Sequence, residues 1–406
     1  MINRPIAEDG IHMAEALRLA RRLPHRPWPN PPVGAVVVRR GAIVGRGAHL
    51  GAGTPHAEVL ALEEAGRRAR GATLYCTLEP CNHTGRTPPC APRVVESGVG
   101  TVVIGIADPN PTAAGGGLAL IREAGIDVRI GAMGEAALDL IWPFASTGAF
   151  TRPFVLLKTA CSLDGCFSAG DHPSAERGEP MYLTGIAARR DVHRLRRWAD
   201  LVLVGERTVA TDRPRLDGRL VREEDECPAA EPVPAYVDTD LSFEGDWRHE
   251  RFYVFAGEQR APLPSRARLA RHGATVVLCG ERDGHVAAEA LLDEARARGS
   301  WSVLLEGGPT LAAAFLNRGL VDRWVCYTAP VFVGGGVRWP DREIGQRSPN
   351  EGRLFHLTNV SQFGSDVRTV FDRLSFREVL ESLTSGVVED LRRRSEGAGN
   401  VHGDRS

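Results

Sequence analysis

The sequence lacks a marked excess of charge of either sign. Lys and Arg together number 50, and Asp and Glu number 51, which gives a formal net charge of -1 over 406 residues. Proteins that bind nucleic acid usually carry a basic surface, often with aromatic residues on which bases stack. This chain contains no basic, aromatic-rich stretch. The composition therefore argues against nucleic acid as a partner.

Long hydrophobic runs are also absent. The N-terminal stretch MINRPIAEDGIHMAEALRLARRL has no apolar signal core, and no run approaches the roughly 20 residues that span a membrane as a helix. Without a secretory signal, the eight cysteines are interpreted as reduced thiols, because disulfides persist mainly outside the cytoplasm. We therefore expect a cytoplasmic protein that has no membrane partner.

The sequence does contain the pattern of a catalytic zinc site. His56-Ala57-Glu58 is followed by Pro80-Cys81, and a loop then ends at Cys90. One imidazole and two thiolates suit tetrahedral Zn²⁺ and leave the fourth position open for water. Glu58 is placed to take a proton from that water and return it to a leaving group. The pattern is typical of zinc deaminases that act on pyrimidine or purine rings. It predicts His56, Cys81 and Cys90 as metal ligands.

The same residues also admit an ordinary structural interpretation. A single His-x-Glu triplet occurs by chance, and a single cysteine is more often a small buried hydrophobe than a ligand. The context favours zinc, because a predicted strand at residues 72–77 ends shortly before Cys81. A predicted helix also starts at Cys90, where the helix dipole favours a thiolate. The spacing is a variant, since eight residues separate two cysteines that zinc deaminases usually place two residues apart.

Hydrophobic periodicity predicts helices alternating with strands along most of the chain, which indicates an α/β protein. We expect two domains, residues 1–150 and 151–383, followed by a polar, disordered tail at 384–406. An acidic, proline-containing segment at 217–232 is predicted to be an exposed loop. The predicted helices lie at residues 11–23, 56–70, 117–124, 135–142, 187–198, 287–298 and 311–317. The predicted strands lie at residues 33–38, 43–48, 72–77, 101–106, 127–130, 154–159, 201–204, 235–237, 252–255, 275–278, 303–305 and 324–327.

Further motifs in both halves resemble the bifunctional deaminase–reductases of riboflavin biosynthesis. The motifs are PNPPVG at 29–34, TLEPCNHTGRTPPC at 77–90, DPNP at 108–111, KTACSLDG at 158–165, ARRD at 188–191, TVATDRP at 208–214 and EGGPT at 306–310. The resemblance implies a three-layer α/β/α domain like that of cytidine deaminase, followed by a domain like dihydrofolate reductase. It also implies a small-molecule substrate and two cofactors, Zn²⁺ and NADPH. We expect a homo-oligomer, either a dimer or a tetramer.

The resemblance further implies the reaction. Zinc-activated water removes the ring amino group of a 2,5-diamino-6-ribosylamino-pyrimidinone 5′-phosphate, and NADPH then reduces the ribosyl group to a ribityl chain. Matching positions imply catalytic residues at Glu58, Lys158 and Glu306. They imply substrate contacts at Asn30, His49, His83, Arg86, Arg196, Leu216, Arg219 and Glu306. They imply NADPH contacts at Cys161, Tyr182, Thr208, Asp212, Thr239, Gly308, Pro309 and Thr310.

The residues by themselves support some of these positions better than others. Lys158 stands inside an apolar strand, where an unpaired charge is costly, so a functional partner is expected. The glycines after Glu306 would let backbone N–H groups reach a phosphate at a helix start, although such a segment is often an ordinary helix start. Without the resemblance, Arg196 and Arg219 would be interpreted as surface arginines, and His49 equally well as a turn cap or as a substrate contact.

Three features depart from the family pattern in the second half. Cys166 stands where a basic residue is usual, Pro180 replaces a serine, and residues 171–179 lengthen the segment before Tyr182. Tyr182 can replace the usual tryptophan as a flat wall for nicotinamide. An alternative is therefore a deaminase with an inactive reductase-like domain. A third hypothesis, a nucleic-acid base deaminase with an added binding domain, is disfavoured by the charge. An active reductase requires Lys158, Arg196, Arg219 and Glu306 to converge on one cleft.

Overall fold

The chain forms two compact units. The computed structural model describes residues 6–23, 26–110, 113–147, 152–168, 182–222, 224–225, 227–245, 249–340 and 354–385. The first unit comprises Met1–Phe150, Glu226–Ala230 and Phe376–Ser406, and the second comprises Thr151–Asp225 and Glu231–Ser375. The helix α13 (Phe376–Ser385), in the part of the chain predicted to belong to the second domain, therefore lies in the first unit. It buries Val379 and Leu383 there. The predicted tail lies outside the described residues from position 386 onward.

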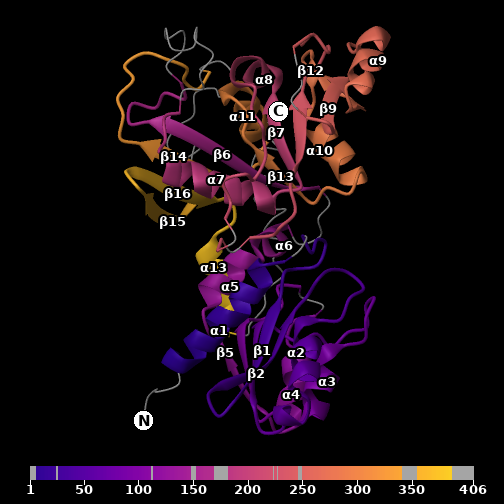
Figure 1. Cartoon of the computed structure of the whole chain (residues 1–406), viewed down its shortest axis with the longest axis vertical. Helices are drawn as coiled ribbons and strands as arrows, with labels where there is room; N and C mark the ends of the chain where they lie inside the picture. Colours follow the sequence, from indigo (N-terminus) through magenta and orange to yellow (C-terminus); the bar gives the residue numbers. More distant parts are fainter. Residues whose placement is uncertain are drawn as a thin grey trace, which may run out of the picture. The chain divides into compact units, whose positions relative to one another are not determined.

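The first unit is built on a five-stranded sheet with the strand order β2-β1-β3-β4-β5 (Figure 1). Its strands are β1 (Gly34–Arg39), β2 (Ala42–Ala48), β3 (Thr73–Leu78), β4 (Thr101–Ile106) and β5 (Asp127–Ile130). β1 pairs in antiparallel fashion with β2 and β3, whereas β3, β4 and β5 are parallel. All five strands were predicted, because each carries a continuous or alternating run of apolar residues.

Helices cover both faces of this sheet, which confirms the predicted three layers. One face carries α1 (Ile6–Arg21), α5 (Gly134–Leu140) and α13, and the other carries α2 (Ala57–Ala65), α3 (Cys90–Ser97) and α4 (Gly116–Glu123) (Figure 1). The 3-10 turn η1 (Gly66–Ala69) follows α2, and α6 (Trp142–Thr147) follows α5. The α2 face packs small residues, since Ala57, Ala61 and Ala65 are almost fully buried against the sheet.

The second unit contains a nine-stranded sheet with the order β10-β9-β8-β7-β13-β6-β14-β16-β15. Its strands are parallel up to β14, and only β16 and β15 run antiparallel to their neighbours. The strands are β6 (Phe154–Ser162), β7 (Leu201–Gly205), β8 (Val233–Val237), β9 (Phe252–Gly257), β10 (Ala274–Cys279), β13 (Ser302–Leu305), β14 (Arg323–Ala329), β15 (His356–Phe363) and β16 (Asp366–Asp372). A two-stranded ribbon, β11 (Glu281–Arg282) and β12 (His285–Val286), lies outside this sheet.

Helices again cover both faces. The helices α10 (Ala288–Ala297) and α11 (Pro309–Asn317) pack on one face, around Leu291, Ala312 and Phe315. The other face carries α7 (Ile186–Trp198), α8 (Glu206–Asp212) and α9 (Leu263–Arg271). Because most strands are parallel, their carboxyl ends meet at one edge of the sheet, which is where α/β proteins usually bind ligands.

Some elements were missed or misjudged from the sequence. The strand β15 exposes Leu357 and Val360, so it lacks the buried alternation that reveals a strand. Residues 217–232 do form a loop where they are described, but the loop is not simply exposed. Asp225 and Cys227 are both buried, and the Asp225 carboxylate accepts hydrogen bonds from Arg190 and Arg194 of α7. Charge in a segment thus did not imply exposure.

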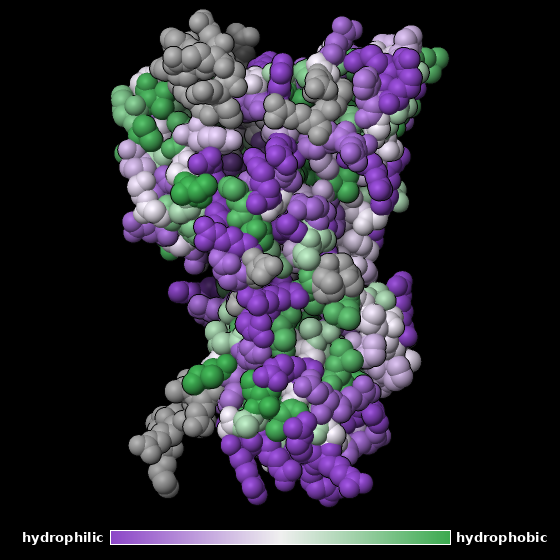
Figure 2. All heavy atoms as spheres, viewed as in Figure 1, coloured by the Kyte–Doolittle hydropathy of each residue, from purple (hydrophilic) through white to green (hydrophobic). Residues whose placement is uncertain are grey.

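Hydrophilic residues cover much of the visible surface of both units, and hydrophobic residues appear there in scattered patches (Figure 2). Within the described ranges, none of the helices combines the length and the apolar character needed to cross a membrane.

Candidate functional site

The predicted zinc ligands meet at the carboxyl end of β3, the central strand of the first sheet. His56 directly precedes α2 with an extended backbone, Cys90 is the first residue of α3, and Cys81 follows β3 by three residues. His56 Nδ1 lies 3.4 Å from Cys81 Sγ and 3.3 Å from Cys90 Sγ, and the two sulfurs are 3.0 Å apart. One ion bonded at 2.0–2.3 Å can reach all three atoms, so this donor set fits Zn²⁺.

Nearby groups orient these ligands. Thr87 Oγ1 lies 3.1 Å from His56 Nε2, which leaves Nδ1 facing the sulfurs. The Cys81 N–H donates to Cys90 Sγ at 3.1 Å. The hydrogen bond that the Cys90 thiol makes to Cys81 lowers the pKa of Cys81 far below its usual range and raises the pKa of Cys90. These shifts favour the thiolate form of Cys81, the form that binds a metal. Sequence reasoning missed Thr87, although it lies in the family-like TPPC segment.

Glu58 lies in the first turn of α2, two residues from His56, and only 3% of it is exposed. Burial raises the pKa of its carboxyl group, and a hydrogen bond with Cys90 acts in the opposite direction. A carboxyl group that is desolvated beside the metal ligands holds a proton more readily than one in water, which suits a group that carries a proton to a leaving group.

The predicted substrate residues of this unit fall into two groups. Asn30 Nδ2 lies 2.8 Å from His49 Nε2, and His49 Nδ1 lies 3.2 Å from the Pro55 carbonyl oxygen. This chain of contacts requires the tautomer with a proton on Nδ1, and it leaves the Asn30 carbonyl oxygen available to a ligand. His83 and Arg86 lie on the loop between the two cysteines, and both are exposed.

Sequence reasoning also missed a buried carboxylate beside the zinc ligands. Glu79 is 4% exposed and accepts hydrogen bonds from the backbone N–H groups of Asp108, Gly115 and Leu118 at 3.1–3.3 Å. These bonds hold the segment after β4 against the loop that carries Cys81. The signal was present, since Glu79 is a charged residue at the end of an apolar strand.

In the second unit, the predicted catalytic residues lie close together, with Lys158 midway along β6 and Glu306 directly after the neighbouring strand β13. Leu157 of β6 pairs with Leu305 of β13, so Lys158 and Glu306 follow at the same level on adjacent strands. Arg196 of α7 grips both Glu306 carboxylate oxygens, with Nε at 2.6 Å and Nη2 at 2.9 Å. This bidentate pair is nearly buried, with side-chain exposures of 11% and 7%.

The charges in this cluster perturb one another. Burial lowers the pKa of Lys158, and the nearby Glu306 carboxylate offsets this only in part. Burial acts to raise the pKa of Glu306, but the charge and hydrogen bonds of Arg196 outweigh it and lower the pKa. Asp212, the last residue of α8, interacts with Lys158, and burial raises the pKa of this carboxyl group. A carboxylate and an amine of lowered pKa therefore stand side by side.

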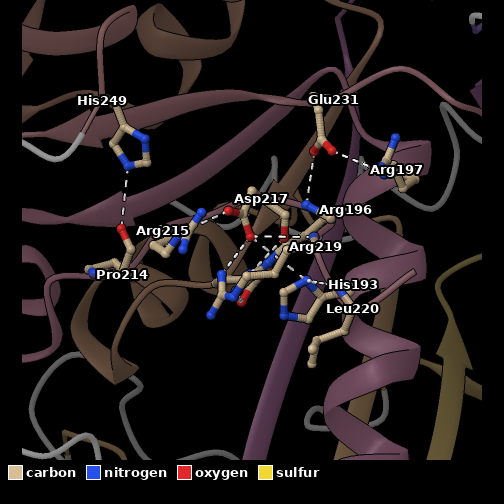
Figure 3. Close-up of polar contacts among 12 residues, drawn as sticks. His193, Arg196, Arg197, Pro214, Arg215, Asp217, Arg219, Leu220, Glu231 and His249 are labelled. Carbon is tan, nitrogen blue, oxygen red and sulfur yellow. Dashed lines mark hydrogen bonds and ion pairs between the residues drawn. The ribbon is translucent and has the colours of Figure 1, made fainter. Parts of the chain in front are cut away.

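The segment between α8 and β8 contacts Arg196 of this cluster (Figure 3). Arg196 Nη1 donates to the Asp217 carbonyl oxygen at 3.1 Å, and Arg219 Nη1 donates to the Asp217 carboxylate at 2.5 Å. The Leu216 side chain is buried in the core, so only its backbone remains to meet a ligand. His193, which sequence reasoning missed, is 5% exposed and faces Arg196 and Arg219.

The predicted cofactor residues are only partly brought together. A Cβ added to Gly308 would lie 3.8 Å from Thr208 Oγ1, so the start of α11 and the helix α8 adjoin. Backbone N–H groups at such a helix start suit a cofactor phosphate. Cys161 lies in β6, three residues beyond Lys158. The Tyr182 ring is 56% exposed, with the Arg189 guanidinium 4.2 Å from its centroid. Thr239 follows β8 and accepts a hydrogen bond from the Val286 N–H.

These residues supply helix-start donors and an exposed aromatic ring, as a dinucleotide requires, so they fit NADPH. Asp212, Pro309 and Thr310 belong to the same two helices, α8 and α11. Pro180 and the predicted insertion at 171–179 lie outside the described residues.

Comparison with known proteins supports both halves of the chain. Residues 7–106 match the family model for the cytidine and deoxycytidylate deaminase zinc-binding region, and residues 153–369 match that for the RibD C-terminal domain. The riboflavin biosynthesis protein RibD of Escherichia coli is 35% identical over 372 residues, which cover 89% of this chain and 98% of that protein.

Two solved structures are similar over nearly their whole length. Acinetobacter baumannii RibD (form 1) is 35% identical with a TM-score of 0.70, and the match covers 90% of this chain and 99% of that one. A diaminohydroxyphosphoribosylaminopyrimidine deaminase/5-amino-6-(5-phosphoribosylamino)uracil reductase from Thermotoga maritima is 33% identical, with the same TM-score and coverage.

Proposed function

Because the chain belongs to the RibD family of bifunctional deaminase–reductases, we propose that its two residue clusters are the two active sites. The protein acts in riboflavin biosynthesis. It deaminates a 2,5-diamino-6-ribosylamino-pyrimidinone 5′-phosphate hydrolytically and reduces the ribosyl group to a ribityl chain with NADPH. No finding favours the alternative of a deaminase with an inactive second domain.

In the first site, His56, Cys81 and Cys90 would hold zinc, which when bound supplies a Lewis acid that lowers the pKa of a water molecule. Glu58 would take the proton of the attacking water and deliver it to the departing ammonia. The observation that supports this role is its position, buried and hydrogen-bonded beside Cys90. Asn30, held by His49, would orient the ring through its free carbonyl oxygen. His83 and Arg86, on the exposed loop, would contact the ribosyl phosphate side.

In the second site, the observation that carries the proposal is the cluster of Lys158, Glu306 and Arg196. Lys158 is the only lysine in the sequence, and all the other residues counted as Lys or Arg are arginines. The presence of this single lysine within a largely buried strand supports a role for Lys158 that arginine cannot fill. Its compact ammonium group transfers a proton readily when its pKa is lowered, whereas guanidinium stays protonated.

We assign Lys158 and Glu306 to the ribose, where Lys158 would protonate the substrate and Glu306 would hold a ribose hydroxyl. Arg219, which is 37% exposed at its side chain, would bind the substrate phosphate, and Arg196 would fix Glu306 beside it. The Leu216 backbone would line the same end of the site. NADPH, when bound, supplies the hydride; Thr208, Asp212, Thr239, Tyr182, Cys161 and the segment Gly308-Pro309-Thr310 would contact it.

The assembly of the chain and its location belong to the same proposal. We propose a homo-oligomer, a dimer or tetramer, that works in the cytoplasm on a small phosphorylated pyrimidine and needs no nucleic acid or membrane. Light scattering of the purified full chain measures the oligomeric state directly, and a monomer would contradict this part of the proposal.

One pair of variants tests the two sites separately. Glu58→Gln keeps the size of the side chain but cannot carry a proton, so ammonia release is expected to fall by ~10²–10⁴. The same variant should keep its zinc and should oxidise NADPH normally when given the deaminated intermediate. Lys158→Gln should release ammonia at the wild-type rate but should lose NADPH oxidation. Glu63→Gln, an exposed glutamate on the same helix α2, is the matched control for the first variant.

The assignments fail in distinct ways. Full ammonia release by Glu58→Gln would place the proton carrier elsewhere. NADPH oxidation at the wild-type rate by Lys158→Gln would remove the lysine from the second site, while leaving the first site unaffected.

A further inference from the structure

Asp217 stands between two arginines in the segment that joins α8 to β8 (Figure 3). Its Oδ2 accepts a hydrogen bond from Arg215 Nε at 3.1 Å, and its Oδ1 accepts one from Arg219 Nη1 at 2.5 Å. The side chain of Asp217 is 25% exposed and that of Arg219 is 37% exposed. The Asp217 carboxylate is therefore already paired with the Arg219 guanidinium, which is proposed to bind the substrate phosphate.

The Asp217 carboxylate accepts one backbone hydrogen bond of this segment, from Arg219 N to Oδ1 at 3.5 Å, and other groups hold the rest of the backbone. Arg196 donates to the Asp217 carbonyl oxygen, and Leu220 N donates to His193 Nδ1 at 3.5 Å. Gly218 N donates to Glu231 Oε2 at 2.9 Å, and Arg197 pairs with the other Glu231 oxygen at 2.7 Å.

The position of Gly218 is constrained as well, since a Cβ there would lie 2.3 Å from Arg197 Nε. The shape of the turn thus depends mainly on α7 and Glu231. The one backbone bond to Asp217 needs only an oxygen acceptor, so the negative charge of Asp217 is available for another role.

That charge is present throughout the neutral pH range. Burial acts to raise the pKa of Asp217, but the hydrogen bond from Arg219 and the charge of Arg215 outweigh it and lower the pKa. The neighbouring imidazole of His193 adds no charge, because burial and the nearby Arg196 and Arg219 lower its pKa to about 4. A phosphate that approaches Arg219 therefore meets an ionised carboxylate already bonded to it.

We propose that Asp217 is a specificity-determining residue that competes with the phosphate group of the substrate for Arg219. The proposal rests on the proposed function, which assigns Arg219 to that phosphate. A ligand that offers only a phosphate must separate the Arg219–Asp217 pair with little compensation. A substrate that also contacts Lys158 and Glu306 gains additional binding free energy there. Asp217 thus weakens the binding of free phosphate and of unrelated phosphorylated molecules. Whether a molecule binds in the site then depends on its contacts with Lys158 and Glu306.

Asp217→Asn tests this, because the amide keeps the size and the carbonyl acceptor but removes the charge. The assay is NADPH oxidation by the full-length enzyme, with the deaminated intermediate as substrate and inorganic phosphate as inhibitor. We expect KM and the inhibition constant of phosphate to fall together by roughly 3- to 30-fold, the effect of one partly screened charge, with kcat within twofold of wild type. The KM of the dephosphorylated intermediate should not change.

Two further variants make the result specific. Asp293→Asn removes an exposed carboxylate from α10 and should leave all of these constants unchanged. Asp217→Thr also removes the charge while keeping an acceptor, and it should reproduce the effect of Asp217→Asn. An unchanged or higher KM in both Asp217 variants would overturn the proposal, since a merely structural residue only weakens the site when replaced.

Arg219→Ala separates this proposal from the one on which it rests. This variant should raise KM for the phosphorylated intermediate and leave KM for the dephosphorylated one unchanged. If it raises neither, the assignment of Arg219 to the phosphate fails. If Arg219→Ala behaves as expected and the Asp217 variants do not, the assignment stands and the competition by Asp217 is refuted.

Discussion

At the scale of single residues, the second unit keeps buried charges in contact with charges of the opposite sign. Glu306 is held by Arg196 in a bidentate pair and lies beside Lys158, so two positive groups and one negative group share a small volume. Breaking such a set by removing one member usually costs more than the set contributes, because an unpaired buried charge remains. Replacing Arg196 should therefore disturb both the stability of the second unit and its chemistry.

His193 provides a test of this electrostatic environment through pH. Its folded-state pKa of about 4 lies below the ordinary value of 6.5, so folding favours the neutral ring. The resulting stability is fully present above pH 6.5 and is lost as pH falls through 4. His193→Gln removes this titration, so the variant should lose less stability than the wild type between pH 7 and pH 4, by up to about 3 kcal/mol.

The measurement is the free energy of unfolding of the full chain by denaturant at several pH values. Replacing the exposed His285 by Gln serves as the control and should leave the pH dependence as in the wild type. A parallel loss of stability in His193→Gln and the wild type would show that the ring takes up its proton as readily in the folded protein as in the unfolded chain.

At the scale of elements, glycines and alanines set the distance between α2 and the sheet. A Cβ added to Gly47 of β2 would lie 2.0 Å from the Ala57 carbonyl oxygen, and one added to Gly45 would lie 2.0 Å from that of Ala61. Real atoms do not approach so closely, so a side chain at either position would push α2 outward. Since His56 directly precedes α2, the zinc ligand would move with it.

Gly47→Ala should therefore destabilise the first unit by about 1–3 kcal/mol, the usual cost of overpacking, and lower its zinc content. Gly10→Ala, in α1, is the matched control, because nothing lies within 4 Å of the added Cβ and alanine favours a helix. Unfolding midpoints and zinc analysis of both variants give the answer. Wild-type zinc content and stability in Gly47→Ala would mean that α2 adjusts without moving His56.

At the scale of the whole molecule, each unit contains its complete residue cluster. The zinc ligands and Glu58 all belong to the first unit, and Lys158, Arg196, Arg219 and Glu306 all belong to the second. Removing the metal should therefore affect one activity and spare the other. A chelator is expected to abolish ammonia release while NADPH oxidation continues on the supplied deaminated intermediate.

The same treatment should lower the unfolding midpoint of the first unit, because a ligand that binds only the folded state stabilises it. Adding zinc back after removal of the chelator is the control and should restore both properties. A loss of NADPH oxidation in proportion to ammonia release would show that the second unit depends on the metal of the first.

The sequence by itself determined the local features of this protein. The zinc pattern was readable because His56, Cys81 and Cys90 lie near helix starts and a strand end, and such positions follow from short-range periodicity and spacing. The five strands of the first sheet were predicted for the same reason. In contrast, β15 has exposed hydrophobic residues, and α13 joins a unit that is distant in sequence, so local pattern did not reveal either arrangement.

Only the tertiary structure decided how distant residues combine. Lys158 and Glu306 are 148 positions apart in the numbering, and they adjoin because β6 and β13 pair in register. The pairing of Arg196 with Glu306 depends on where α7 packs against the sheet, and so does the placement of Asp217 beside Arg196. Sequence spacing cannot encode such contacts, because strand order and helix packing arise from burial of the whole core rather than from neighbouring residues.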